Sequence, residues 1–281
     1  MLTRAAIQSY QAGTFRLHAP LTSAEQAVEY VNQRGFIYFW PITGIRLPSL
    51  WVAAAGDRPV ADAHDDPGHA TWSWKDSLLG QHAWYYAKVL RKKATIISLA
   101  LAPAFYALSE NYGSPEEDYL TLYEQGRLTQ ESRAVYEALL EHGALHTVEL
   151  RRAARLSSLE SEARFNRAIT DLQAGFLVAP VGVADAGAWH YAFIYDIVAR
   201  AYPELAAQAR FLGDPEARAR LVQAYFQSVG AAQLRDVSRL FQWNSSDLDR
   251  ALNRLVASGF LHRGLQLDDI CGEWLAIPFL L

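Results

Sequence analysis

Two stretches in the last two thirds of the chain share one pattern of apolar and polar positions. In each, an amphipathic segment ends at a glycine (Gly143 or Gly230), a short helical segment follows, and a third segment ends in Gly-Phe-Leu, at 175–177 or 259–261. Glycine is a common residue at helix ends. The third segments carry apolar residues three and four positions apart, which predicts a helix with one buried face: Phe165, Ile169 and Leu172 in the first, and Leu248, Leu252 and Leu255 in the second.

After each third helix, the sequence predicts a pair of strands. The first pair is expected at 176–183 and 188–195, with a turn at Asp185-Ala186-Gly187, and the second at 260–265 and 274–280. The order of helix, turn, short helix, helix and strand pair is the winged helix-turn-helix plan. The expected fold class is therefore α+β, mainly α, with tandem winged helix-turn-helix units and short β-hairpin wings, one unit at 113–205 and one at 206–281.

The N-terminal residues 1–112 form a separate, aromatic-rich domain in this interpretation. Thr22-Ser23-Ala24-Glu25 has the pattern of a capping box, so we expect a helix that starts there and ends near Gly35. The run Phe36–Trp40 follows as a strand. This order also fits a third, degenerate winged-helix unit.

Composition places the chain among folded soluble proteins, since 51% of its residues are hydrophobic and 20% are charged. The net charge of -4 requires that any nucleic-acid binding come from a local basic patch. Cys271 is the single cysteine, which excludes a disulfide framework and favours a reducing compartment. The start of the chain lacks a signal peptide's apolar core, and the apolar stretch 94–108 is too short to span a bilayer. We therefore expect a cytoplasmic protein without membrane association.

Candidate catalytic groups gather at residues 62–76, where His64, Asp65, Asp66 and His69 lie close together in sequence. Carboxylates and imidazoles at this density suit a general base or a divalent metal, although such a stretch is more often a plain polar surface loop or a substrate-facing loop. Their spacing matches no metal motif, so no metal is expected. The sequence contains no Gly-x-Gly-x-x-Gly and no P-loop, and we expect neither a nucleotide nor any other cofactor.

Aromatic and basic side chains are the candidates for nucleic-acid contact. Tyr38, Trp40 and Trp72 could stack on bases, although large aromatic residues are more often part of a core. Arginine and lysine can bind phosphates, and arginine can also bind guanine edges, although neighbouring acidic residues could neutralise them. The basic candidates are Lys75, Lys88, Arg91, Lys92, Lys93, Arg151, Arg152, Arg155, Arg164, Arg167, Arg250 and Arg254.

Tandem winged helices, the Gly-Phe-Leu endings and the run Gly35-Phe36-Ile37-Tyr38-Phe39-Trp40 resemble the AlkZ/YcaQ superfamily over about residues 22–265. These are tandem winged-helix DNA glycosylases that unhook interstrand crosslinks and remove N-alkylated purines. The resemblance implies a catalytic Gln-x-Gln or Gln-x-Asp motif on the strand after the first helix. When Gly35 is aligned, Tyr38 and Trp40 occupy those two places, and neither is an amide or a carboxylate.

Three hypotheses follow. The first is a bacterial, nucleoid-associated protein that binds double-stranded DNA, including damaged or crosslinked DNA, without cleaving it. The second is an active glycosylase whose base is Asp65 or Asp66, assisted by His64 or His69. The third is a winged-helix transcriptional regulator or a scaffold for other proteins. The first is preferred because it requires no new catalytic site.

Overall fold

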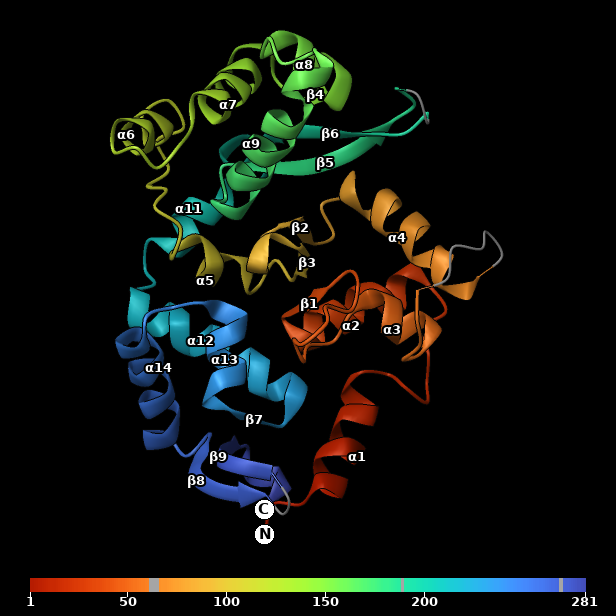
Figure 1. The fold of residues 1–281 in the computed structure, drawn as a ribbon, viewed down its shortest axis with the longest axis vertical. Coiled ribbons are helices and arrows are strands. Elements are labelled where there is room, and N and C mark those ends of the chain that lie inside the picture. The colour runs from red at the N-terminus through yellow and green to blue at the C-terminus, as the bar shows by residue number, and fades with distance from the viewer. Residues whose placement is uncertain (61–65, 188–189, 268–269) are drawn as a thin grey trace.

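The computed structural model describes residues 1–60, 66–187, 190–267 and 270–281, and three copies of one element order make up most of it (Figure 1). Each copy runs helix, strand, helix, helix, strand, strand. Its strands form one antiparallel sheet, with the last strand between the other two. The expected fold class is confirmed: the chain is α+β, mainly α, and built from tandem winged-helix units.

The N-terminal unit has the complete winged-helix order. Its elements are α2 (Ala24–Arg34), β1 (Phe36–Tyr38), α3 (Leu50–Ala55), η1 (Pro67–His69), α4 (Ala70–Leu79), β2 (Tyr85–Lys88), η2 (Leu90–Lys92) and β3 (Ala94–Ile97). Ser23 caps α2 by accepting from the Gln26 N–H, so the cap lies one residue later than the sequence indicated. Gly35 ends α2 at a φ of 78°, as expected.

The middle unit follows α6 (Asp118–Glu124). Its elements are α7 (Gln130–His142), β4 (Leu145–His146), α8 (Thr147–Ala153), η3 (Leu159–Ser161), α9 (Glu162–Ala174), β5 (Val178–Ala184) and β6 (Ala192–Ile197). The side chains of Phe165, Ile169 and Leu172 are buried, as the spacing predicted. They pack with Val135 and Leu139 of α7 in the core of this unit.

The C-terminal unit repeats the plan with α12 (Asp214–Val229), β7 (Ala231–Gln233), α13 (Leu234–Phe241), α14 (Ser245–Ala257), β8 (His262–Leu267) and β9 (Ile270–Ala276). Leu248, Leu252 and Leu255 of α14 are buried, which again confirms the predicted face. The remaining elements connect or close the units: α1 (Arg4–Thr14), α5 (Ala102–Tyr106), α10 (Val198–Ala201), α11 (Glu204–Ala209) and η4 (Pro278–Leu280).

One hydrophobic core joins the three units. It includes Phe36 and Tyr85 of the N-terminal unit, Phe176 of the middle unit, and Tyr225 of the C-terminal unit. Rings from two units meet directly, because Tyr85 stacks on Phe176 with a centroid distance of 4.5 Å. Across the described residues, no helix has the length and apolar character needed to cross a membrane.

The wing of the N-terminal unit, β2–η2–β3, inserts between the other two units. On one side Lys88 Nζ donates to Thr170 Oγ1 of α9 at 3.3 Å, and Lys92 pairs with Asp171 of the same helix. On the other side, η2 contacts α13. This wing is therefore a packing element at the centre of the molecule.

The chain ends also meet. The N-terminal ammonium donates to the Leu281 carbonyl at 3.0 Å, and both ends lie at the same place in Figure 1. Helix α1 runs beside α12, where buried Gln11 donates from Nε2 to the Val229 carbonyl at 2.8 Å. These contacts hold α1 against the C-terminal unit, so that distant parts of the sequence face one another.

Candidate functional site

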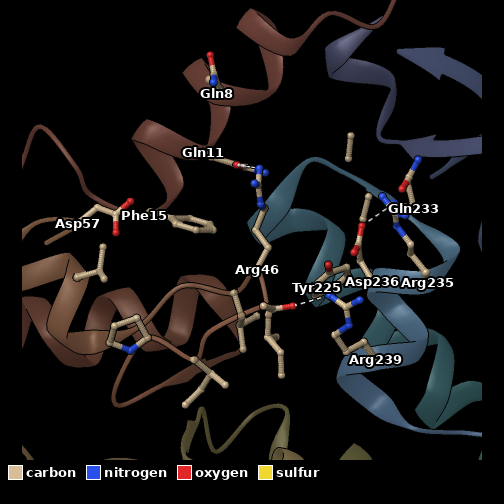
Figure 2. Close-up of a pocket in the computed structure, with 18 of the residues that line it drawn as sticks. Gln8, Gln11, Phe15, Arg46, Asp57, Tyr225, Gln233, Arg235, Asp236 and Arg239 are labelled. Carbon is tan, nitrogen blue, oxygen red and sulfur yellow. Dashed lines mark hydrogen bonds between the residues drawn. The ribbon is translucent and has the colours of Figure 1, made fainter. Parts of the chain in front are cut away.

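A pocket of about 750 Å³ lies between α1, residues 41–47 and the C-terminal unit (Figure 2). The segment 41–47 directly follows Trp40, one of the two places that the family resemblance assigns to catalysis. Figure 2 shows Arg46 near the centre, Phe15 and Asp57 on one side, and the side chains of α13 on the other. The polar and charged residues that line the pocket are Gln8, Gln11, Arg46, Asp57, Gln233, Arg235, Asp236 and Arg239. We call this the arginine pocket.

Three exposed arginines bring positive charge to the pocket: Arg46, Arg235 and Arg239. Arg46 Nη1 donates to Gln11 Oε1 at 3.0 Å, and Arg239 Nη1 donates to the Gly44 carbonyl at 2.9 Å. Arg235 has no hydrogen bond or ion pair from its side chain to the described residues. Because a guanidinium group carries five N–H donors, all three arginines keep donors available for an anion.

The local structure of α13 explains how two of these arginines share a face. Helix α13 begins with a capping box, in which the Gln233 N–H donates to Asp236 Oδ2 at 3.2 Å. Arg235 and Arg239 are four residues apart, so they lie one turn apart on the same side of the helix. Val237 and Leu240 are buried on the other side. The apolar face fixes the helix, and the arginines face the pocket.

Two carboxylates also line the pocket. Asp236 is held by its role in the capping box. Asp57 is exposed and has no hydrogen bond or ion pair from its side chain to the described residues. A free carboxylate can accept a proton from a bound water molecule, so among the described residues that line the pocket Asp57 is the acid that could serve as a base.

Two of the residues predicted to be catalytic, Asp66 and His69, do not line the arginine pocket. Asp66 caps η1 by accepting from the Gly68 N–H at 2.7 Å, and it pairs with Arg58 at 2.7 Å. The hydrogen bond from Arg58 holds the pKa of Asp66 below its usual value. The Asp66 carboxylate therefore has a structural role that the sequence did not reveal.

Of the two histidines at residues 62–76, the structure describes His69. His64 and Asp65 lie outside the described residues. His69 ends η1, with its ring 6.1 Å from the ring of Trp51. The described residues contain no group of three or more His, Cys, Asp and Glu side chains that could hold a metal ion.

The N-terminal aromatic residues are mostly core. Tyr38 is 0% exposed, so its ring cannot stack on a base in this structure, contrary to its selection as a contact residue. Trp40 is partly buried, with its ring 4.9 Å from that of Trp51 and 5.5 Å from that of Trp72. Trp72 is 36% exposed and remains a candidate for stacking.

Lys75 was predicted to contact DNA, but its side chain is 1% exposed and cannot reach a phosphate. Its Nζ lies 2.7 Å from Asp76 Oδ1 and donates to the Tyr191 hydroxyl at 2.8 Å. Five aromatic rings surround the ammonium group at 4.5 to 5.7 Å: Phe39, Trp72, Tyr86, Tyr191 and Phe193. This cluster fastens the hairpin β5–β6 of the middle unit to α4.

The basic run at 88–93 divides between two neighbours. Lys88 and Lys92 face α9, as described above. Arg91 Nη1 donates to the Arg239 carbonyl at 3.0 Å, which brings one predicted contact residue beside the arginine pocket. Lys93 is exposed.

The arginines of the middle unit are partly engaged. Arg151 donates to the Leu156 and Ser158 carbonyls, both at 3.0 Å, and Arg164 lies 3.3 Å from Glu131. Three others are exposed and have no hydrogen bond or ion pair from their side chains to the described residues: Arg152, Arg155 and Arg167. They remain candidates for phosphate contact.

The arginines of α14 are tied to acidic residues. Arg250 pairs with Asp247, and Arg254 pairs with Glu216 of α12. The alternative that neighbouring acids would neutralise this face therefore holds for the C-terminal unit.

None of the eight polar and charged residues named above as lining the pocket was among the candidates predicted from the sequence. One signal was present for the arginines of α13, which stand four residues apart on a short helix. Another was the position of Arg46 just after the strand that carries the family motif. Neither signal shows that the two segments meet.

Comparisons with known proteins agree with this architecture. A family model described as AlkZ related matches residues 21–242, which is more than half of the chain. Among solved structures, the chain is similar to Streptomyces sahachiroi DNA glycosylase AlkZ, with a TM-score of 0.60 and 13% sequence identity over 98% of this chain and 69% of that chain. At that identity the likeness establishes the fold alone. No curated protein matches the sequence.

Proposed function

Because the chain belongs to the AlkZ-related family, and is thereby related to DNA-repair glycosylases, we propose that it binds double-stranded DNA in the arginine pocket and does not cleave the glycosidic bond. This role would place it with the nucleoid in a bacterial cytoplasm. Damaged or crosslinked duplexes are the ligands that the family relationship favours.

The observation that carries the proposal is the convergence of Arg46, Arg235 and Arg239 from two units on one concave surface. The whole chain has a net charge of -4, so three exposed guanidinium groups in one pocket are a local exception. DNA carries a dense row of phosphates, and arginine binds phosphate oxygens with charged, often bidentate hydrogen bonds.

The absence of cleavage is supported by Tyr38 and Trp40, at the places that the resemblance assigns to the family's catalytic pair. Burial raises the pKa of the Tyr38 hydroxyl above its ordinary value. That hydroxyl therefore keeps its proton at neutral pH and cannot act as a base. The indole of Trp40 offers one N–H donor and accepts no proton.

Asp57 supports a second candidate function, an active glycosylase. In that reaction a water molecule attacks C1′ of an N-alkylated purine nucleotide and gives its proton to Asp57. The C1′–N bond breaks, and its electron pair neutralises the cationic base as it leaves. The exposed carboxylate within the arginine pocket favours Asp57 over Asp66, which is engaged by Arg58.

A binding titration with a short duplex tests the first proposal. Fluorescence anisotropy is recorded from about 50 mM to about 200 mM salt, where each phosphate contact contributes roughly 0.9 to the slope of log K against log salt. We expect binding that weakens steeply with salt. No binding at the low-salt end, or binding insensitive to salt, would contradict the proposal.

The second candidate is decided on duplexes that carry N7-alkylguanine. After incubation, the DNA is probed for abasic sites with the wild type and with Asp57→Asn. We expect no abasic sites from either protein. Abasic sites produced by the wild type and lost in Asp57→Asn would establish the glycosylase instead.

A further inference from the structure

We propose that the C-terminal unit contacts DNA through α13, its second helix, and not through α14. In winged-helix proteins the third helix of the unit normally enters the major groove, and in this unit that helix is α14. The inference rests on the proposed DNA binding and names the face that performs it.

The outer face of α14 carries three separate clusters of ion pairs, which it shares with α12 and the last hairpin. Asp247 receives both Arg250 and Arg218, the latter at 3.2 Å. Glu216 of α12 likewise receives Arg254 and Arg220, the latter at 3.0 Å. Together the three clusters contain five arginines and five acids: Arg218, Arg220, Arg250, Arg254 and Arg263 with Asp214, Glu216, Asp247, Asp249 and Glu273.

This balance makes α14 a poor partner for a phosphate backbone. A phosphate that approached Arg250 or Arg254 would also approach Asp247 or Glu216. The arginine would exchange one anionic partner for another, and the freed carboxylate would repel the phosphate. Little binding free energy is left for DNA.

The face of α13 has the opposite balance. Arg235 and Arg239 are exposed one turn apart, and Asp236 between them is held in the capping box. The N-terminal unit adds Arg91, bonded to the Arg239 carbonyl, and Arg46 across the pocket. We call these four arginines the α13 ridge. Among the described residues that line the arginine pocket, the acids are Asp57 and Asp236, against three arginines of the ridge.

The arginines of the α13 ridge come from two units, the N-terminal and the C-terminal unit. Arg239 Nη1 donates to the Gly44 carbonyl at 2.9 Å, and η2 of the N-terminal wing contacts α13. A phosphate on this ridge would therefore meet donors whose positions are fixed by packing between units. Such preorganisation lowers the entropy cost of binding.

Matched single substitutions test the inference. Arg235→Gln removes an exposed arginine with no hydrogen bond or ion pair from its side chain within the described residues. Arg250→Gln and Arg254→Gln remove exposed arginines from α14 of the same unit. Duplex binding is measured over salt for all three and for the wild type, and thermal unfolding by circular dichroism verifies that each variant is folded.

For Arg235→Gln we expect the salt slope to fall by about one unit, and the affinity at about 50 mM salt to fall roughly tenfold. For Arg250→Gln and Arg254→Gln we expect no change in slope. Losses in the α14 variants with none in Arg235→Gln, or equal losses in all three, would overturn the inference while binding of the duplex itself stands. A wild type that does not bind the duplex would overturn both.

Discussion

Lys75 shows how burial changes what a cation can do. In the sequence it is one of several lysines near aromatic residues, yet in the structure its ammonium group is enclosed by rings and bonded to Asp76 and Tyr191. Rings within about 6 Å attract a cation through their π-faces, but removal from water penalises the charge. Lys75 therefore helps to hold the N-terminal and middle units together.

This environment predicts a pH effect on stability. Burial lowers the pKa of Lys75 below its usual 10.5. Between that lowered value and 10.5, the unfolded chain binds more protons than the folded protein, so the Lys75 contribution to stability rises with pH. Below this window the charged form is present in both states, and the burial penalty applies in full.

Lys75→Met removes that contribution. We expect the free energy of unfolding of the wild type, relative to the variant, to increase as pH rises toward the ordinary lysine pKa. Urea titrations at a series of alkaline pH values measure it. The series must stop below about pH 10, the pKa of tyrosine in the unfolded chain. Burial raises the pKa values of tyrosines such as Tyr86 and Tyr191, so above about pH 10 they lower the free energy of unfolding as pH rises. A difference that stays flat over this range would contradict the account.

At the scale of elements, the wing of the first unit has become a packing element. The wing β2–η2–β3 lies between α9 and α13, and the hairpin β5–β6 is fastened to α4 through Lys75 and Tyr191. A wing that contacts the DNA backbone needs an exposed tip on the binding face. The N-terminal wing is packed between two helices, whereas Asp185 and His190 of the middle unit's hairpin are exposed.

Helix ends near unit boundaries depend on glycine. Gly230 ends α12 with a φ of 74°, and a Cβ there would lie 2.7 Å from the Tyr10 ring and 2.8 Å from Leu280. Gly126 has a similar φ of 72°, but a Cβ added to it would meet nothing within 4 Å. The two positions share the backbone strain and differ only in crowding.

We therefore expect Gly230→Ala to cost more stability than Gly126→Ala, by roughly 1–3 kcal/mol for the added crowding. Chemical unfolding of the two variants beside the wild type measures this. The contact of α1 with α12 is the one disturbed, so the N-terminal helix should also exchange amide hydrogens faster in Gly230→Ala. Equal losses in the two variants would show that α1 yields without cost.

Periodicity predicted the long elements, because each third helix buries one face. Phe165, Ile169 and Leu172 repeat at helical spacing and are buried. The short strand β1 lies within the strand expected at Phe36–Trp40, but β4 and β7 were not predicted, since the two repeats were expected to have only a turn between their first two helices. A strand of two or three residues has no period to detect, and it exists because the last strand of each sheet pairs with it.

At the scale of the whole molecule, the arginine pocket forms where three segments that are distant in the sequence come together. Gln11 lies on α1, Arg46 follows β1, and Arg235 lies on α13 near the other end of the chain. The packing of α1 against α12 and the contact of both chain ends bring them together. The sequence indicated which residue types could bind DNA, but not that these three would share a surface.

The same reasoning explains why two arginines that pair with acids were predicted from the sequence to contact DNA. Arg250 and Arg254 have the spacing of a DNA-contacting helix face, and their neutralisation depends partly on Glu216, which lies on another helix. Tertiary pairing of this kind leaves no local pattern. The unit boundaries at 112/113 and 205/206, and the roles given to Arg152, Arg155 and Arg167, stay predictions.

The most direct test of the account is a hydrogen-exchange footprint of the protein on a duplex. At salt low enough for saturation, amide exchange is compared with and without DNA. The account predicts slower exchange in residues 41–47 and in α13 (Leu234–Phe241), with no change in α14 (Ser245–Ala257). Protection confined to α9 and α14, with residues 41–47 and α13 unaffected, would show that DNA binds elsewhere and contradict the central claim.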